Sequence, residues 1–391
     1  MTAPSSYSVA DYGAMIVDPV RLDRYVRALE QAVRPEAVVV DIGTGTGIFA
    51  LLACRFGARR VYAIEPDDVI QVAREIAGAN GCADRIEFIQ AMSTRVTLPE
   101  RADVIISDLT GALPWFMHHI PSIIDARRRL LAPGGVLIPR QDTAWAAIVS
   151  VGELYQRWTG PWNGAAADLD MAAARRIIVN TTTSFHVTDE NLLTEPQRWG
   201  ATDYATVESA NVRERMTWTI ARSGTAHGFA AGFDRTLADG IWMSNAPDAP
   251  EAARPTIYPT LLFPWPEPVE LVPGDRVTID LNATLMRHDY VWTWKTHVAG
   301  DDGAEKAAFS QSTFYGWPLS PATLRRWAAS TVPALSEEGR IARAVLDAMN
   351  EGVPLGEIAK QIAAGFADRF PRPGDALSFV AELSRRYCGG S

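Results

Sequence analysis

The sequence predicts an α/β domain built on a doubly wound parallel sheet, followed by a β-rich domain and a small helical module. Residues 38–139 alternate short apolar runs with amphipathic segments, as strands and helices do in such a sheet. Beyond residue 139 the chain changes to alternating strands rich in Thr, Val and aromatic residues, bounded by Pro and Gly turns. From residue 339 apolar residues recur at helical spacing. We therefore expect domains at residues 1–139, 140–325 and 330–391.

The expected strands of the parallel sheet are four apolar runs, at residues 38–40, 61–64, 86–89 and 104–106. Helical spacing predicts helices at residues 47–56, 69–79 and 120–131, the last ended by Pro133-Gly134-Gly135. In the β-rich domain, residues 275–283 alternate polar and apolar side chains and predict a strand. Residues 158–201 fit neither pattern, so we expect an arm or a lid there.

Composition is that of a globular chain. With 391 residues, 47% of them hydrophobic and 21% charged, two or three domains are expected. The net charge of -9 gives no general attraction for phosphate backbones, so we expect no nucleic-acid partner. The dense basic cluster Arg127 to Arg129 is interpreted as the solvated face of a helix, with a nucleic-acid site as the alternative.

Cysteine usage and hydropathy bear on the compartment. Cys54, Cys82 and Cys388 are too few and too scattered for a disulfide framework or a zinc site, so we expect no metal. The first residues lack the basic start and apolar run of a signal peptide, and no stretch of about 18 apolar residues occurs. The expected location is the cytoplasm, without a membrane partner.

A glycine-rich loop follows the first expected strand, where residues 41–47 read Asp-Ile-Gly-Thr-Gly-Thr-Gly. Glycines before a helix let the backbone approach a ligand closely, with free amides at the helix N-terminus. The spacing is Gly-x-Gly-x-Gly, which differs from the Gly-x-Gly-x-x-Gly that seats a dinucleotide pyrophosphate. Glu65 ends the second expected strand, where a carboxylate can accept both ribose hydroxyls of an adenosine. Loop and acid together indicate an adenosine cofactor; the alternative is a plain tight turn with Glu65 on the surface.

Asp108 ends the fourth expected strand and opens toward the same carboxyl edge of the sheet. Open α/β sheets bind their ligands at that edge, so we expect Asp108 in the reaction cleft. The alternative is a helix or turn cap before Gly111.

These residues resemble the protein arginine methyltransferase family, and the likeness covers about residues 7–314. The resemblance implies a class I methyltransferase Rossmann domain joined to a β-barrel, and a head-to-tail homodimer whose arm is residues 158–201. The motifs that carry it are Tyr12-Gly13-Ala14-Met15, Gly57 to Glu65, Ser107-Asp108-Leu109-Thr110-Gly111, Leu131 to Pro139, His227-Gly228-Phe229, Gly232-Phe233-Asp234 and Pro273-Gly274-Asp275.

The same resemblance implies an S-adenosylmethionine site. Arg21, in the helix that covers the cofactor in this family, takes the role of holding the methionine carboxylate. The expected cofactor-binding residues are Arg21, Asp41, Gly43, Thr44, Gly45, Gly47, Glu65, Pro66, Ser93 and Asp108.

The acceptor loop departs from the family pattern. The family holds a guanidinium with two glutamates, because paired carboxylates make bidentate hydrogen bonds. Here Asp108 stands at the first position and Met117 at the second, Thr94 replaces the adenine-side glutamate, and Thr256-Ile257-Tyr258 replaces Thr-His-Trp. A guanidinium beside a single carboxylate would be poorly held, so a neutral or smaller acceptor fits better. The residues expected at the substrate are Tyr12, Met15, Met117 and Tyr258.

Four residues are candidates for the chemistry. Asp108 would orient or deprotonate the acceptor. His118 and His119, next to Met117, could supply a general base with a near-neutral pKa, or they could merely cap or pack. Glu153 could also reach the site.

The C-terminal module, residues 335–387, resembles small winged-helix domains of the pyrroloquinoline-quinone peptide chaperone type. The resemblance rests on residues 346–352, 355–359 and 379–383. It implies a module that holds the leader of a ribosomally made peptide, docked by strand addition to a sheet edge. The alternative is a plain helical cap.

The expected function is S-adenosylmethionine-dependent N-methylation of a side chain in a peptide or protein, such as a ribosomal peptide precursor. One alternative keeps the enzyme class and gives it a small metabolite as acceptor. Another is a cofactor-binding scaffold without catalysis, suggested by the missing second carboxylate. The loop spacing disfavours an NAD-dependent oxidoreductase.

Overall fold

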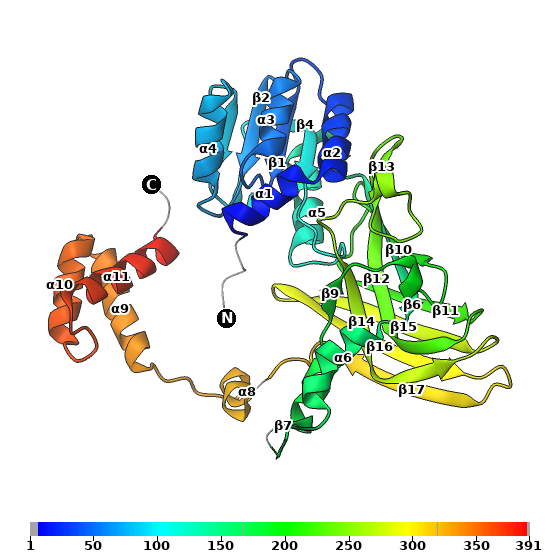
Figure 1. Cartoon of the computed structure of the whole chain (residues 1–391). Helices are drawn as coiled ribbons and strands as arrows, with labels where there is room; N and C mark the ends of the chain where they lie inside the picture. Colours follow the sequence, from blue (N-terminus) through cyan, green and yellow to red (C-terminus); the bar gives the residue numbers. More distant parts are fainter. Residues whose placement is uncertain (1–6, 167, 319, 389–391) are drawn as a thin grey trace. The chain divides into compact units, whose positions relative to one another are not determined.

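The computed structural model describes residues 7–166, 168–318 and 320–388 of the chain (Figure 1). The contacts divide it into two compact units, Met1–Pro318 and Leu319–Ser391. The first unit holds both expected sheet domains. The boundary between the two units follows Pro318, earlier than the expected boundary between residues 325 and 330. Helix α8 (Pro321–Trp327) therefore belongs to the C-terminal unit.

A five-stranded parallel sheet forms the core of the N-terminal part. Its strands are β1 (Val38–Ile42), β2 (Arg60–Ile64), β3 (Ile86–Ile89), β4 (Ala102–Ser107) and β5 (Leu131–Ile138), in the order β3-β2-β1-β4-β5. The four predicted strands are confirmed. Since the strand order reverses between β1 and β4, their carboxyl ends border the crevice where doubly wound sheets bind ligands.

The helices of this part are α1 (Val9–Val17), α2 (Pro19–Ala32), α3 (Ile48–Arg55), α4 (Ile70–Ala79) and α5 (His119–Arg129). Ser8 and Asp11 form a capping box at the start of α1. Asp18 caps α2 by accepting from the Arg21 backbone N–H, and Pro19 supplies the preset φ favoured in a first helical turn. The backbone is extended at Asp18, between α1 and α2, and Arg21 in the first turn of α2 pairs with Asp108 just after β4.

Two antiparallel sheets follow. The first has the order β10-β6-β12-β14-β9, with β13 paired to β12; the second has the order β11-β15-β16-β17. Phe229, Phe263, Trp265 and Trp294 are completely buried in the core that both sheets share. The strands are β6 (Gln141–Val149), β9 (Thr183–Phe185), β10 (Gln197–Asp203), β11 (Val212–Thr219), β12 (Gly224–Ala238), β13 (Ile241–Ser244), β14 (Thr260–Leu271), β15 (Arg276–Met286), β16 (Asp289–Ala299) and β17 (Glu305–Ser312).

Strand β12 connects the two parts of the first unit. Its first half pairs with β6 and β14, and Phe229 lies in the shared core of the antiparallel sheets. Its second half carries Phe233 and Leu237 into the apolar core beneath α2 and α3. Residues between these anchors, including Arg235, are thereby held against the carboxyl end of the parallel sheet.

Residues 158–201, expected as an arm, divide into a projecting part and strands that belong to the first antiparallel sheet. The projecting part begins with α6 (Gly152–Thr159) and includes α7 (Arg175–Ile178), and in Figure 1 α6 and β7 (Ala165–Ala166) project from the antiparallel sheets. Strand β9 lies within residues 158–201 and β10 begins there, but they pair with β14 and β6. The projecting part is therefore shorter than predicted, because these strands find their partners far away in the sequence.

The C-terminal unit is helical, with α8, α9 (Glu337–Asn350), α10 (Leu355–Gly365) and α11 (Pro373–Tyr387). Ile341, Val345, Ile358, Ile362 and Val380 form its own apolar core. Within residues 320–388 the structure contains no strand, so the expected docking by strand addition has no sheet edge in this part of the chain. No helix among the described residues is long and apolar enough to cross a membrane.

Candidate functional site

The glycine-rich loop joins β1 to α3 as the sequence predicts. Gly43, Gly45 and Gly47 all have positive φ, at 74°, 52° and 88°, which only glycine adopts without strain. A Cβ atom at Gly45 would lie 2.3 Å from Cε1 of Tyr12, so glycine is also needed for the close approach of α1. The N-terminal helix thus lies directly over the loop.

Asp41 ties the loop to the start of α3. Its Oδ2 accepts from the Thr44 hydroxyl at 2.6 Å and from the Ala50 backbone N–H at 3.0 Å. Its Oδ1 is buried without a hydrogen-bond partner. Burial raises the pKa of Asp41 to about 7. An unpartnered acceptor behind a glycine loop is a feature that a polar ligand could complete.

Glu65 follows β2 and points back to the same loop. It accepts from the backbone N–H groups of Gly45 at 3.0 Å and Asp67 at 3.1 Å. The side chain is buried, and burial raises its pKa. The surface alternative for Glu65 is therefore wrong. Among the other expected cofactor residues, Ser93 is buried while Pro66 is exposed.

Arg21 reaches Asp108 across the crevice. Its Nε and Nη2 donate to Asp108 Oδ2 at 2.8 and 2.7 Å, and its Nη1 donates to the Met15 carbonyl at 3.0 Å. Tyr258 donates to the same Asp108 oxygen at 2.5 Å. Of the five N–H groups of this guanidinium, one on Nη1 and one on Nη2 have no hydrogen bond to the described residues. Arg21 therefore retains two donors for an anionic group.

Arg235 holds the other side of Asp108, and sequence reasoning missed it. Its Nη1 donates to Asp108 Oδ1 at 2.8 Å and to the Tyr25 hydroxyl at 3.1 Å. Its Nε and Nη2 donate to the two oxygens of Asp142, both at 2.8 Å, and Nη2 also donates to the Thr110 hydroxyl at 2.7 Å. All five N–H groups are used, and the side chain is completely buried.

The charges of this cluster explain the pKa of Asp108. Burial alone would raise that pKa, but Arg21 and Arg235 outweigh burial and hold it below its usual value. The same burial, reinforced by Asp108, raises the pKa of Tyr258, so its hydroxyl stays protonated. Every hydrogen bond described for Asp108 comes from a side chain, which disfavours the alternative of a backbone cap.

Neither histidine expected as a base has a hydrogen bond to Asp108 among the described residues. Nε2 of His118 lies 3.1 Å from Nδ1 of His288 in the β15–β16 turn. His119 is buried, with Nε2 at 2.8 Å from the Tyr204 hydroxyl, which in turn donates to Asp142. Burial lowers the pKa of His119 to about 4, so the near-neutral value expected for it is wrong.

Two further expected residues lie away from Asp108. Met117 has a φ of 43°, and its backbone N–H points to Asp289 at 3.4 Å. Glu153 is exposed in the first turn of α6. No hydrogen bond within the described residues joins either side chain to the Asp108 cluster. Their proposed roles at the substrate and in catalysis remain predictions.

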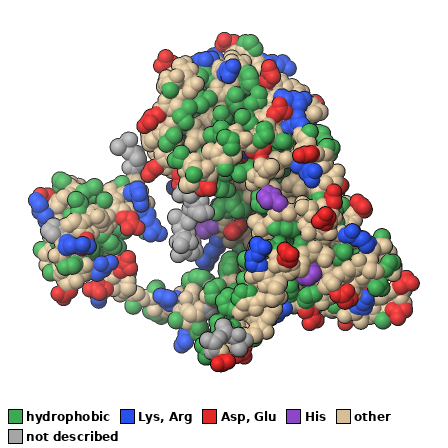
Figure 2. Space-filling view, viewed as in Figure 1, with side chains coloured by type: hydrophobic (Ala, Val, Ile, Leu, Met, Phe, Trp, Pro, Cys, Tyr) green, Lys and Arg blue, Asp and Glu red, His purple; other side chains and the backbone are tan. Residues whose placement is uncertain are grey.

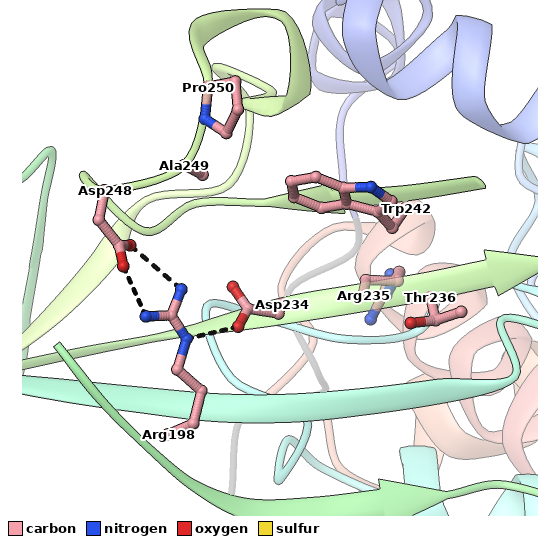
Figure 3. A pocket seen from close by; sticks show the side chains of 8 residues that line it. All are labelled: Arg198, Asp234, Arg235, Thr236, Trp242, Asp248, Ala249 and Pro250. Atoms are coloured by element: carbon pink, nitrogen blue, oxygen red, sulfur yellow. Dashed lines mark hydrogen bonds and ion pairs between the residues drawn. The ribbon is translucent and has the colours of Figure 1, made fainter. Parts of the chain in front are cut away.

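A surface pocket of about 300 Å³ lies beside β12 and β13 (Figure 3). Arg198 bridges its walls through ion pairs with Asp234 and Asp248, so these charged groups already satisfy one another. Arg235 contributes to the lining, yet none of its hydrogen-bond partners does. We therefore place the candidate site at the Asp108 cluster and not at this pocket.

On the face of the molecule drawn in Figure 2, basic and acidic side chains are interspersed. That distribution resembles an ordinary solvated surface. In the described structure Arg127 and Arg128 both pair with Glu208, and Arg129 pairs with Asp125. The three positive charges of this cluster are thus partly offset by two neighbouring carboxylates.

Comparisons with known proteins agree with this geometry. Residues 24–142 match the family described as ribosomal protein L11 methyltransferase. A probable protein arginine N-methyltransferase 6 of Arabidopsis thaliana is 31% identical over 229 residues, which are 56% of this chain and 52% of that protein. The protein arginine N-methyltransferase PRMT10 of Oryza sativa subsp. japonica is 36% identical over 187 residues, 47% of each chain. The chain spans about half the length of these curated relatives.

Solved structures match over more of the chain. Arabidopsis thaliana protein arginine methyltransferase 10 has a TM-score of 0.67 at 21% identity and covers 78% of this chain and 97% of its own. A Trypanosoma brucei PRMT1 enzyme-prozyme heterotetrameric complex with AdoHcy has a TM-score of 0.69 at 21% identity, covering 79% and 98%. The first unit thus has the fold of these methyltransferases, a Rossmann domain followed by a β-barrel domain, and its sequence is similar to protein arginine N-methyltransferases.

Proposed function

We propose that this chain is an S-adenosylmethionine-dependent methyltransferase that N-methylates a side chain of a peptide or protein. The observation that carries the proposal is the meeting of three features at one edge of the sheet: the glycine loop, Glu65 and the Arg21–Asp108 pair. The named relatives are protein arginine N-methyltransferases, and two of the similar structures are named with AdoHcy or SAH.

The residues present fit this cofactor. Arg21 has two N–H groups available for its carboxylate, and the glycine loop allows its backbone to come close. Glu65 has two carboxylate oxygens, each accepting one backbone N–H, so each keeps acceptor capacity for a ribose hydroxyl. When bound, the sulfonium supplies an electrophilic methyl group with a good leaving group.

The remaining chemistry is positioning. A methyl transfer needs an in-line approach of the acceptor and exclusion of water, which together can account for most of the acceleration. Asp108 is suited to orient groups by accepting hydrogen bonds, because its lowered pKa makes it a weak base. Tyr258 adds a neutral hydroxyl beside it.

The test uses the full chain with methyl-labelled S-adenosylmethionine and peptides from a cell lysate. Glu65→Gln should weaken cofactor binding in calorimetry by about tenfold or more, the value of a charged hydrogen bond. Asp108→Asn should keep cofactor binding and lose transfer. Glu190→Gln, an exposed carboxylate, is the matched control and should change neither. Cofactor binding with no transfer would favour a non-catalytic scaffold, and label on metabolites alone would favour the small-molecule enzyme.

Three finer proposals accompany this function. We propose a homodimer joined through the projecting part that carries α6 and α7, which light scattering of the full chain and of a chain lacking that part would test. We propose that the C-terminal unit binds the leader of a peptide substrate; its separate core supports an independent role. We also propose a cytoplasmic location, in keeping with three cysteines that are all unpaired.

A further inference from the structure

Both oxygens of Asp108 are already engaged by cations of the chain itself. Oδ1 accepts from Arg235, and Oδ2 accepts from Arg21 and Tyr258. The side chain is 7% exposed, so water does not compete for these positions. A cationic substrate group would therefore find the charge of Asp108 already balanced by Arg21 and Arg235.

The two arginines differ in what they can still bind. Arg21 has two unused N–H groups, whereas Arg235 has none. Arg21 can therefore turn part of its bonding toward a ligand carboxylate. Arg235 cannot do so without breaking bonds to Asp142, Thr110 or Tyr25, all in a completely or nearly completely buried setting. In this structure Arg235 is a counter-ion of Asp108 that has no N–H group left for a ligand.

A cationic acceptor is excluded by this arrangement. Asp142, the other carboxylate of the cluster, is 0% exposed and bound by Arg235 and Tyr204. A guanidinium entering beside Asp108 would stand next to Arg235 with no unpaired carboxylate to offset its lost hydration. Burying such an uncompensated charge is strongly unfavourable.

The cluster also offers no base for removing a bound proton. The pKa of Asp108 is lowered, the pKa of Tyr258 is raised, and His119 lies behind Tyr204 with a pKa of about 4. Amide and hydroxyl acceptors must lose a proton as they react, and lysine is protonated at neutral pH. Imidazole, with an ordinary pKa of about 6.5, is mostly neutral there and keeps a free nitrogen lone pair.

We propose that Arg235 is a specificity-determining residue, standing as the internal counter-ion of Asp108, and that the acceptor is the uncharged imidazole nitrogen of a histidine side chain. This inference rests on the methyltransferase function proposed above. The Tyr258 oxygen accepts from Arg21 Nε at 3.1 Å and donates to Asp108, which leaves it one acceptor position for the single N–H of a neutral imidazole, on the ring nitrogen that does not attack the methyl group.

The reaction balances without a protein base. The imidazole lone pair forms the new bond to the methyl carbon, and the electrons of the sulfur–methyl bond return to sulfur, giving a neutral thioether. The ring is then a methylimidazolium, and its remaining N–H loses its proton to water. No oxidant, metal or further reactant is needed.

The closing experiment locates the label in the lysate assay described above by mass spectrometry of the labelled peptides. Methyl groups on histidine support the inference. Label on arginine, lysine or another residue overturns it while leaving the proposed methyltransferase function in place. No label on any acceptor overturns both.

A labelled peptide then allows a quantitative test with its synthetic copy and a matched peptide carrying arginine instead of histidine. The wild type should prefer histidine by at least a hundredfold in kcat/KM, and kcat/KM should fall about tenfold per pH unit below pH 6, as the imidazole protonates. The double variant Arg235→Met with Asp142→Asn removes one positive and one negative charge, and should shift the ratio toward arginine by at least tenfold. Arg140→Met, in an exposed pair with Asp239, is the control and should leave the ratio unchanged. An unchanged ratio in a folded double variant would overturn the role of Arg235.

Discussion

Replacing Arg235 by methionine should be among the most destabilising single substitutions in the first unit. Methionine keeps much of the volume and removes all five hydrogen bonds of the guanidinium. Asp108 would still have Arg21 and Tyr258. Asp142 would keep only the Tyr204 hydroxyl, at 2.6 Å, in a site that is 0% exposed. A carboxylate left buried without its cation costs about 3–5 kcal/mol.

The double variant separates charge from packing. Adding Asp142→Asn to Arg235→Met removes the stranded carboxylate, so most of the loss should be recovered, at least about 2 kcal/mol. Urea denaturation followed by tryptophan fluorescence reports on the first unit, because every tryptophan except Trp327 lies there. Arg140→Met, whose pair with Asp239 is exposed, should cost less than about 1 kcal/mol.

Two results would refute this reasoning. A loss below about 1 kcal/mol for Arg235→Met would mean that the guanidinium is not the counter-ion of a buried carboxylate. A double variant as unstable as the single one would mean that the loss comes from packing and not from charge.

Two further predictions concern the loop and His119. Gly45→Ala should weaken S-adenosylmethionine binding at least tenfold in calorimetry, because the new Cβ would clash with the Tyr12 ring. The control is Gly240→Ala, at a φ of 72° with open space around it. This substitution should cost only backbone strain and leave binding unchanged. His119, with a folded pKa of about 4 against 6.5 unfolded, binds fewer protons in the folded state between those values, so stability falls as pH drops from 6.5 to 4, by up to about 3 kcal/mol. His119→Phe should remove that part of the pH dependence. The free energy of unfolding of both proteins would be measured by urea denaturation between pH 4.5 and 7, and equal slopes against pH would contradict the prediction. Comparing the two proteins cancels the opposite effect of Asp41, which both contain.

The parallel sheet could be predicted because its signal is local. Strands buried on both faces appear as continuous apolar runs, and all five residues of β1 are indeed buried. The end of a helix was harder to predict where a strand follows it almost directly. The helix expected to reach residue 131 ends at Arg129, and Leu131 already pairs in β5. Strands β9 and β10 escaped prediction because they are short and their partners lie far along the chain.

The cofactor side of the site was predictable for a related reason. The loop after β1 needs glycines because its backbone has positive φ, and Glu65 comes directly after β2. Both features can be recognised from residues next to a predicted strand. Arg21 and Asp108 lie 87 positions apart, and only the resemblance to a family of known fold brought them together. Sequence spacing alone gives no reason to pair them.

The role of Arg235 could not be predicted from the residues next to it in the sequence. It follows Asp234 in a strand and lies 127 positions from Asp108, so in the sequence it looks like one of the charges on a solvated strand face. Its burial arises only because the second half of β12 inserts Phe233 and Leu237 beneath α2, which leaves the intervening guanidinium no path to water. A buried arginine needs a paired carboxylate, and Asp108 and Asp142 both lie beside this one. Asp108 and Asp142 are thus already balanced by Arg21 and Arg235, and this balance of charge is what supports the neutral acceptor proposed above.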